Sequence, residues 1–370
     1  HADGANMLAD ALQPHGGILI WRAFVYGHGE ADRHKKAYAD FVPHDGSFRE
    51  NAIVQVKNGA IDFQPREPFH PLFGSMPNTN MFMEFQVTQE YLGQGNHVVY
   101  LGPMWQEILQ FDTHAHGPGS SVGSLLTRGA PGSRLSGMAA VSNIGDDPTW
   151  CGSHMHPANW YAYGRLAWDY TLDAESIARE WITCTFDTTR EGERAILELM
   201  MDSWEACIDY MTPLGLHHIM QEGHHYGPDP GYDAGEREDW RSTYYHRADA
   251  AGLGFDRSRS GTGAVDQYHT PVADMFDSVE TCPEDYLLWF HHVPWDYQMS
   301  SGRTLKDELK YRYARGVARA EQMHTIWKGL HGKIDSERWK AVLQKLWIQV
   351  EDAREWQEVC TAYFMPFSEK

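Results

Sequence analysis

The first 172 residues alternate short β-forming runs with polar or helical stretches, and this alternation constrains the fold more than any other feature. Five runs predict strands, at residues 17–26, 53–57, 84–89, 98–101 and 138–143. Helical stretches at residues 31–41 and 103–111 lie between some of them. Strands that alternate with helices pair in parallel, because the crossover helix returns the chain to the same end of the sheet. The pattern therefore predicts an α/β fold.

Two acids, Asp62 and Glu90, lie at or just past the ends of predicted strands, and Arg22 lies within a third, otherwise apolar strand. In a (β/α)8 TIM barrel, the C-terminal ends of the strands carry the active site. Five strands are too few for such a barrel, so the sheet is either open or the later part of a barrel. The chain runs quickly from His1 into a strand, which favours the second alternative. We therefore expect residues 1–172 to form the later strands and helices of a barrel.

Residues 173–370 are expected to form a mostly α-helical C-terminal domain. Helices are predicted at residues 172–185, 188–211 and 304–330, and from residue 336 onward. Residues 213–296 are rich in Gly, Pro, His and Tyr, and we expect them to form loops that cover the active site. The last two helices should pack as an antiparallel pair, because the final helix carries an apolar stripe. Its members are Trp339, Val342, Leu343, Leu346, Trp347, Val350 and Ala353. A subunit interface and an intrachain core both remain open for this stripe.

Composition argues against several classes of protein. The net charge of −20 and the absence of a Lys/Arg cluster disfavour nucleic-acid binding. No apolar run approaches the ~20 residues that a membrane span needs. The five cysteines are far apart and include no C-x-x-C, which disfavours a disulfide framework or a thiolate zinc site. No signal peptide is visible, but His1 is not an initiator residue, so the compartment stays open.

Asp62 and Glu90 are the candidate catalytic residues. On neighbouring strands of a barrel, both carboxylates could reach one pocket, where repulsion would raise the pKa of one and help to activate water. Taken singly, Asp62 could cap a loop and Glu90 could be an exposed glutamate at a strand end. Arg22 and Lys57 are candidate substrate-binding residues. A buried cation needs a partner, and that partner could be a structural acid or a carboxylate of the substrate.

The 21 histidines raise the question of a metal site. The chain lacks the His-Glu-x-x-His pattern of zinc peptidases, and the side chains of adjacent histidines are expected to diverge. We therefore expect no metal or other cofactor. Several histidines lie among Tyr, Gly and Pro, a setting that suits hydrogen bonds to sugar hydroxyls. No G-x-G-x-x-G after a strand, P-loop or G-x-S-x-G elbow is present, which disfavours nucleotide, hydride-transfer and serine-hydrolase functions.

Five phrases carry a resemblance to a known family. They are VKNGAIDFQ at 56–64, EFQVTQEY at 84–91, SNIGDD at 142–147, GHHYGP at 223–228 and FHHVP at 290–294. Together, and in this order across essentially the whole chain, they resemble bacterial and fungal α-glucuronidases of glycoside hydrolase family 67.

The resemblance implies an N-terminal β-sandwich, a central (β/α)8 barrel and a C-terminal helical domain involved in dimerisation. It implies removal of (4-O-methyl)glucuronic acid, α-1,2-linked to the terminal non-reducing xylose of xylo-oligosaccharides (aldouronic acids), with inversion and without metal. Asp62 and Glu90 match the acids on the water side, and Arg22 and Lys57 match residues that hold the glucuronate carboxylate. Trp240 matches an aromatic residue near the 4-O-methyl group.

The family's general acid and a further carboxylate-binding lysine match no residue here and are expected upstream of His1. This leaves a second function open, a non-catalytic carbohydrate-binding or dimerisation portion. A histidine-rich metallohydrolase is a third alternative. The sequence does not rank Asp62 and Glu90 as the base.

Overall fold

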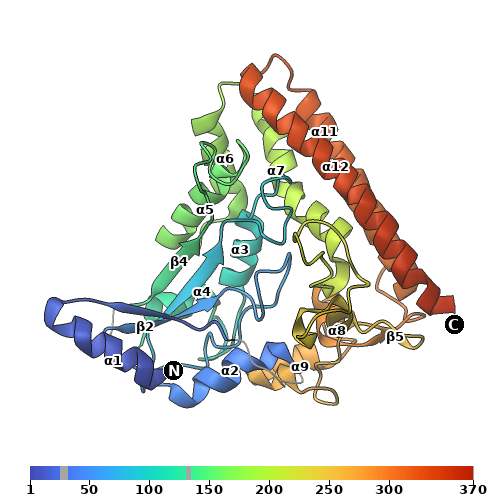
Figure 1. The fold of residues 1–370 in the computed structure, drawn as a ribbon. Helices are drawn as coiled ribbons and strands as arrows, with labels where there is room; N and C mark the ends of the chain where they lie inside the picture. Colours follow the sequence, from blue (N-terminus) through green and yellow to red (C-terminus); the bar gives the residue numbers. More distant parts are fainter. Residues whose placement is uncertain (26–31, 131–134, 370) are drawn as a thin grey trace.

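A four-stranded parallel sheet organises the first part of the chain (Figure 1). The computed structural model describes residues 1–25, 32–130 and 135–369. In them, the sheet has the order β1 (Leu19–Arg22), β2 (Ala52–Lys57), β3 (Met81–Gln86) and β4 (Gly137–Val141). All three pairings are parallel, with Arg22 opposite Gln55 and Lys57 opposite Glu84. The predicted α/β class with a parallel sheet is confirmed.

The predicted strands differ from the observed ones in detail. The prediction at 53–57 matches β2 closely, whereas β3 begins three residues before the predicted residue 84. Residue 26, the predicted end of the first strand, lies outside the described residues. The strand predicted at 98–101 is wrong. There, side chains replace a sheet ladder, because the backbone N–H groups of Val98, Tyr100 and Leu101 donate to Gln349, Ser203 and Asn159 at 2.8–3.0 Å.

Helices connect β1 to β2 and β3 to β4, whereas residues 58–80 between β2 and β3 contain none. Between β1 and β2 lie η2 (Arg33–Lys35), α2 (Lys36–Phe41) and η3 (Val42–His44). They match the helix predicted at 31–41, of which residue 31 lies outside the described residues. Between β3 and β4, α3 (Gly102–Gln110) confirms the helix predicted at 103–111, and α4 (Val122–Arg128) is additional. At the start of the chain, α1 (Ala2–Leu12) and η1 (Gln13–His15) precede β1.

Long helices dominate the C-terminal part (Figure 1). They are α5 (Pro157–Trp168), α6 (Ala174–Thr185), α7 (Arg190–Met211), α11 (Leu305–Lys328) and α12 (Ser336–Phe364), followed by η8 (Met365–Glu369). The side chains of Asp173, Thr189, Thr304 and Asp335 each accept a backbone N–H at a helix start. These four caps explain why the sequence located α6, α7, α11 and α12 closely.

The last two helices form the predicted antiparallel pair, and α7 packs against both of them. At the turn between them, the indole N–H of Trp327 donates to the Trp339 carbonyl at 3.0 Å, and that of Trp339 donates back at 3.2 Å. Most of the apolar stripe on α12 is buried within the chain, with Val342 and Leu346 fully covered. Trp339 and Leu343 are half-buried, and Trp347 is exposed at 52%.

Residues 213–296 contain only short elements, as predicted. These are η4 (Pro213–Gly215), η5 (Glu238–Trp240), α8 (Ser242–His246), β5 (Gly252–Leu253), η6 (Ala264–Gln267), α9 (Thr270–Asp277), η7 (Glu284–Tyr286), α10 (Leu287–Phe290) and β6 (Val293–Pro294). A fully buried ion pair, in which Arg257 Nε lies 3.1 Å from the Asp32 carboxylate, ties this segment to the chain after β1. No helix in the described part of the chain is both long and apolar enough to cross a membrane.

Candidate active site

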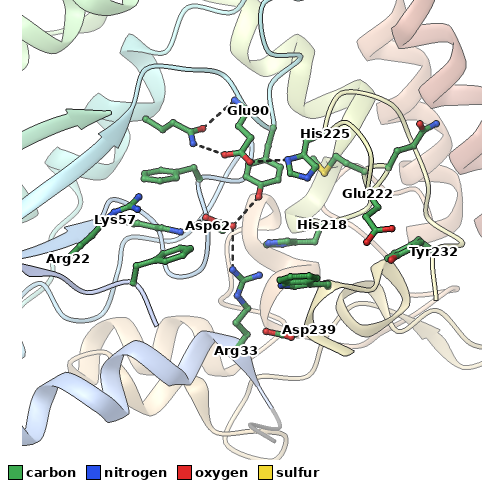
Figure 2. A pocket seen from close by; sticks show the side chains of 17 residues that line it. Arg22, Arg33, Lys57, Asp62, Glu90, His218, Glu222, His225, Tyr232 and Asp239 are labelled. Carbon is green, nitrogen blue, oxygen red and sulfur yellow. Dashed lines mark hydrogen bonds and ion pairs between the residues drawn. The ribbon is translucent and has the colours of Figure 1, made fainter. Parts of the chain in front are cut away.

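A cavity of about 440 Å³ opens where β1, β2 and β3 end (Figure 2). Parallel strands present their C-terminal ends at one edge of a sheet, which is where ligands bind in α/β folds. Residues 218–240 of the irregular segment form the opposite wall. All five residues singled out from the sequence line this cavity: Arg22, Lys57, Asp62, Glu90 and Trp240. The structure therefore brings them together, and their chemical roles stay predictions.

Asp62 lies deep in the cavity between positive charges. Its carboxylate pairs with Lys57 Nζ, lies 3.3 Å from Arg33 Nη2 and accepts a hydrogen bond from Tyr91 Oη at 3.0 Å. Burial alone would raise the pKa of this carboxyl group. The charges of Lys57 and Arg33 outweigh burial and lower the pKa of Asp62 to about 2. Asp62 is therefore a carboxylate at any physiological pH.

A second acid fixes the loop that carries Asp62. The buried carboxylate of Glu67 accepts the backbone N–H groups of Ile61, Asp62 and Gln64 at 2.6, 2.7 and 2.8 Å. Phe63, between these donors, has a left-handed φ of 51°, a conformation that costs a non-glycine residue energy. Three bonds to one carboxylate offset that cost and hold the Asp62 backbone in a single orientation.

Glu90 lies at the more open side of the cavity. Gln86 Nε2 donates to Glu90 Oε2 at 2.8 Å, and His225 Nδ1 lies 3.1 Å from Glu90 Oε1. The rings of His225 and Tyr91 stack with centroids 4.7 Å apart. Tyr91 therefore links the two acids, because its hydroxyl bonds to Asp62 while its ring supports the partner of Glu90.

Arg22 has a structural acid as its partner. Its guanidinium bonds to the fully buried carboxylate of Glu84 on β3, through Nε at 2.7 Å and through Nη2. Gln55 also donates to Glu84, at 2.5 Å. The Arg22 side chain nevertheless stays 46% exposed at the cavity. Of the two partners that the sequence allowed, the structure supplies the structural one, and Glu84 thereby orients Arg22.

Lys57 is buried, and its nearest charged neighbour is Asp62. Its ammonium group lies 3.7 Å from the centre of the Phe24 ring and 5.1 Å from that of Phe63. Burial lowers the pKa of Lys57, although the adjacent Asp62 charge opposes this. Aromatic faces and a carboxylate together stabilise the buried charge. Lys57 and Asp62 thus act as one unit within the site.

Trp240 lies at the rim of the cavity and is 54% exposed. The guanidinium of Arg237 lies 4.8 Å from the Trp240 ring centre and pairs with Asp239 at 2.5 Å. An exposed aromatic face braced in this way is suited to packing against a sugar ring.

Sequence reasoning missed several residues of the site. Arg33, His218, Glu222 and Asp239 line the cavity, and Glu67 and Glu84 support it from behind. His225 stands in the GHHYGP phrase, which assigns it no individual role. Glu84 stands in the phrase EFQVTQEY, and the signal for the others was position, close to a strand end or within the loop-rich segment. Among residues 1–25, 32–130 and 135–369, no group of three or more His, Cys, Asp or Glu side chains is arranged to hold a metal ion.

Comparison with known sequences identifies the family. Residues 1–150 match the "Glycosyl hydrolase family 67 middle domain" and residues 151–370 match the "Glycosyl hydrolase family 67 C-terminus". The chain belongs to glycosyl hydrolase family 67. The resemblance found in the sequence is thus confirmed. Residues from both matched family 67 regions line the cavity.

Curated relatives of this chain include fungal enzymes. Alpha-glucuronidase A of Emericella nidulans is 42% identical over 98% of this chain, and Alpha-glucuronidase of Hypocrea jecorina is 40% identical over 99% of it. The chain spans 44% of the length of each. A solved GH138 enzyme targeting pectin rhamnogalacturonan II superposes with a TM-score of 0.44 at 11% identity, over 96% of this chain and 47% of that one. That similarity is too low to support a common fold.

Proposed function

We propose that this family 67 chain hydrolyses the α-1,2 bond between (4-O-methyl)glucuronic acid and the terminal non-reducing xylose of xylo-oligosaccharides, with inversion. The observation that carries the proposal is the convergence of Asp62, Glu90 and three cations on one sugar-sized cavity at the strand ends, with Glu222 and Asp239 on the opposite wall. Relatives named alpha-glucuronidase at 40–42% identity support it. An anionic sugar needs local cations in a protein whose net charge is −20, and this cavity supplies them.

In an inverting hydrolysis, one carboxylate deprotonates water while a carboxylic acid, roughly 6.5–9.5 Å away, protonates the leaving oxygen. We assign the base to Glu90. Its partners are an amide and a histidine, whereas Asp62 is held by two cations that make it a weak base. Asp62 would orient the water and stabilise the positive charge that develops on the sugar. Expulsion of the leaving group also needs a proton donor, and that donor must be an acid other than Asp62 and Glu90.

The uronate carboxylate would bind at the cationic wall. Arg22 is exposed at the cavity and oriented by Glu84, and Lys57 and Arg33 add positive potential from behind Asp62. Arginine offers a fork of donors and lysine a compact charge. Trp240 at the rim would pack on the sugar near its 4-O-methyl group.

We further propose that the parallel sheet is the later part of a (β/α)8 barrel, with residues 1–172 in the barrel and 173–370 in the helical domain. The order β1-β2-β3-β4 follows the chain, as successive barrel strands do. A homodimer through the C-terminal helices would use the exposed Trp347 face of α12. We propose no nucleic-acid partner, in keeping with the charge of −20.

An assay on aldouronic acids tests the proposal. The protein should release glucuronic acid, and Glu90→Gln should abolish the release without loss of fold. Binding of the oligosaccharide without turnover would instead support a carbohydrate-binding portion, the alternative that the unmatched general acid leaves open. Inactivation by a chelator would support a metallohydrolase and contradict the proposed mechanism.

A further inference from the structure

A chain of hydrogen bonds runs from a buried ion pair to the wall of the cavity. Asp32 and Arg257 are both fully buried and paired. Arg257 Nη1 lies 3.2 Å from His217 Nε2, and His217 Nδ1 lies 2.8 Å from His218 Nδ1. His218 lines the cavity, and Figure 2 shows its ring extending toward Asp62. The adjacent histidines therefore do not diverge, contrary to our expectation, because His218 has a left-handed φ of 53° that turns the two rings together.

The direction of each bond follows from chemistry. Arginine can only donate, so His217 Nε2 accepts and the proton of a neutral His217 is on Nδ1. That proton is donated to His218 Nδ1, which must then be an acceptor. A neutral His218 consequently carries its own proton on Nε2. The fixed charge of Arg257 thus sets the tautomer of a ring two side chains away.

Both histidines are neutral in this environment. Burial lowers the pKa of His217 well below its usual value, and Arg257 lowers it further. Burial likewise lowers the pKa of His218; nearby Arg33 and Arg257 add to the effect, and Asp62 opposes it. The ring of His218 is also held in place, stacked on Tyr245 with centroids 4.0 Å apart.

The Nε2 atom of His218 is shielded from solvent and has no hydrogen-bond partner among the residues that the structure describes. Buried donors are almost always satisfied, and an unmade bond costs about 1–3 kcal/mol. An oxygen atom that enters the cavity beside Asp62 would satisfy it. Because the ring is neutral, it can donate this bond without adding to the charge that already surrounds Asp62.

We propose that His218 is a sugar-binding residue, whose Nε2–H donates to an oxygen of the uronic acid seated beside Asp62, and that Asp32, Arg257 and His217 position this donor from behind the cavity. The proposal rests on the proposed function for the identity of the sugar. The position of the proton does not depend on it.

Long-range ¹H–¹⁵N NMR spectra of the labelled protein test both parts, with His218→Gln used to assign the signal. We expect neutral His218 with the proton on Nε2 from about pH 5 to 8, and a shift of its signal when D-glucuronate binds. His246 is a matched control outside the cavity lining, since its Nε2 donates to the Pro230 carbonyl at 2.9 Å and its Nδ1 accepts from Ala248 N at 2.9 Å. Its signal should show the same tautomer and stay unmoved.

Each outcome decides one part. A proton on Nδ1 of His218 would contradict the proposed chain of hydrogen bonds from Arg257 through His217 to His218. A His218 signal that stays unmoved while calorimetry shows D-glucuronate bound would overturn the sugar contact. If D-glucuronate does not bind at all, the proposed function fails. The tautomer of His218 then still tests the hydrogen-bonded chain from Arg257 to His218.

Three variants distinguish loss of the hydrogen-bond donor from loss of the fold. His218→Leu should weaken D-glucuronate binding about fivefold to tenfold, the value of one hydrogen bond, while His218→Gln, which keeps an N–H donor, should lose less. His217→Phe keeps a flat ring on Trp289, where His217 now stacks at 3.9 Å, and should release His218 into a mixture of tautomers. Wild-type affinity in a folded His218→Leu protein would contradict the proposal.

Discussion

Replacement of the two acids should affect stability very differently. Asp62 is 13% exposed between two cations, whereas Glu90 is 34% exposed. The pKa of Asp62 falls from 3.8 to about 2. At about 1.4 kcal/mol per pKa unit, ionised Asp62 stabilises the fold by about 2–3 kcal/mol. Asp62→Asn also leaves Lys57 and Arg33 without their counter-charge, so the total loss should be about 3–5 kcal/mol. Glu90→Gln should cost less than about 1 kcal/mol.

Urea unfolding at two pH values measures this difference. A group whose pKa is lowered in the fold contributes stability above its unfolded pKa, here 3.8, and loses it as the pH falls through the folded value, here about 2. The gap between wild type and Asp62→Asn should therefore be full at pH 7 and should shrink as the pH falls from about 4 toward 2. Equal losses for Asp62→Asn and Glu90→Gln at pH 7 would refute the ion-pair account.

Three further outcomes follow from the cavity. Glu67→Gln should lower both stability and turnover, since it breaks the three hydrogen bonds that anchor the Asp62 loop. Asp112→Asn, which disturbs a similar turn outside the cavity lining, should lower stability alone. Equal turnover in the two variants would contradict a role of Glu67 in positioning Asp62. Arg22→Ala should weaken D-glucuronate binding much more than methyl glucoside binding in calorimetry, and equal losses would remove Arg22 from carboxylate recognition. Trp240→Ala should raise KM about threefold to tenfold, the value of one aromatic contact, with unfolding unchanged because the ring is 54% exposed; an unchanged KM would argue against sugar packing.

Local signals allowed much of the fold to be predicted. The helices α6, α7, α11 and α12 each begin at a side-chain cap that the sequence displays. By contrast, α1 and α5 begin without a side-chain cap bond and were not predicted. Residues 98–101 have strand composition but bond to side chains from α5, α7 and α12. Such long-range partners leave no trace in local pattern, and this explains the error.

The site shows the same contrast between local signals, which could be predicted, and long-range contacts, which could not. Asp62, Glu90 and Lys57 were found because they stand in phrases of the family, Arg22 because it is a cation in an apolar strand, and Trp240 through the family resemblance alone. Lys57 and Asp62 pair across only five positions, but the partners that come from distant parts of the chain were not found. Glu84 meets Arg22 across 62 positions and Arg33 meets Asp62 across 29. The sequence allowed several of the charged residues at the strand ends to be predicted, but which of them pair with each other depends on the fold.

The anomeric form of the first product tests the account most directly. Proton NMR can follow hydrolysis of an α-1,2-linked aldouronic acid in real time. The account predicts that β-glucuronic acid appears first and that the α-anomer grows in later by mutarotation, with no product from Glu90→Gln. Initial release of the α-anomer, or undiminished turnover by folded Glu90→Gln, would contradict a base at Glu90 that activates water for inversion.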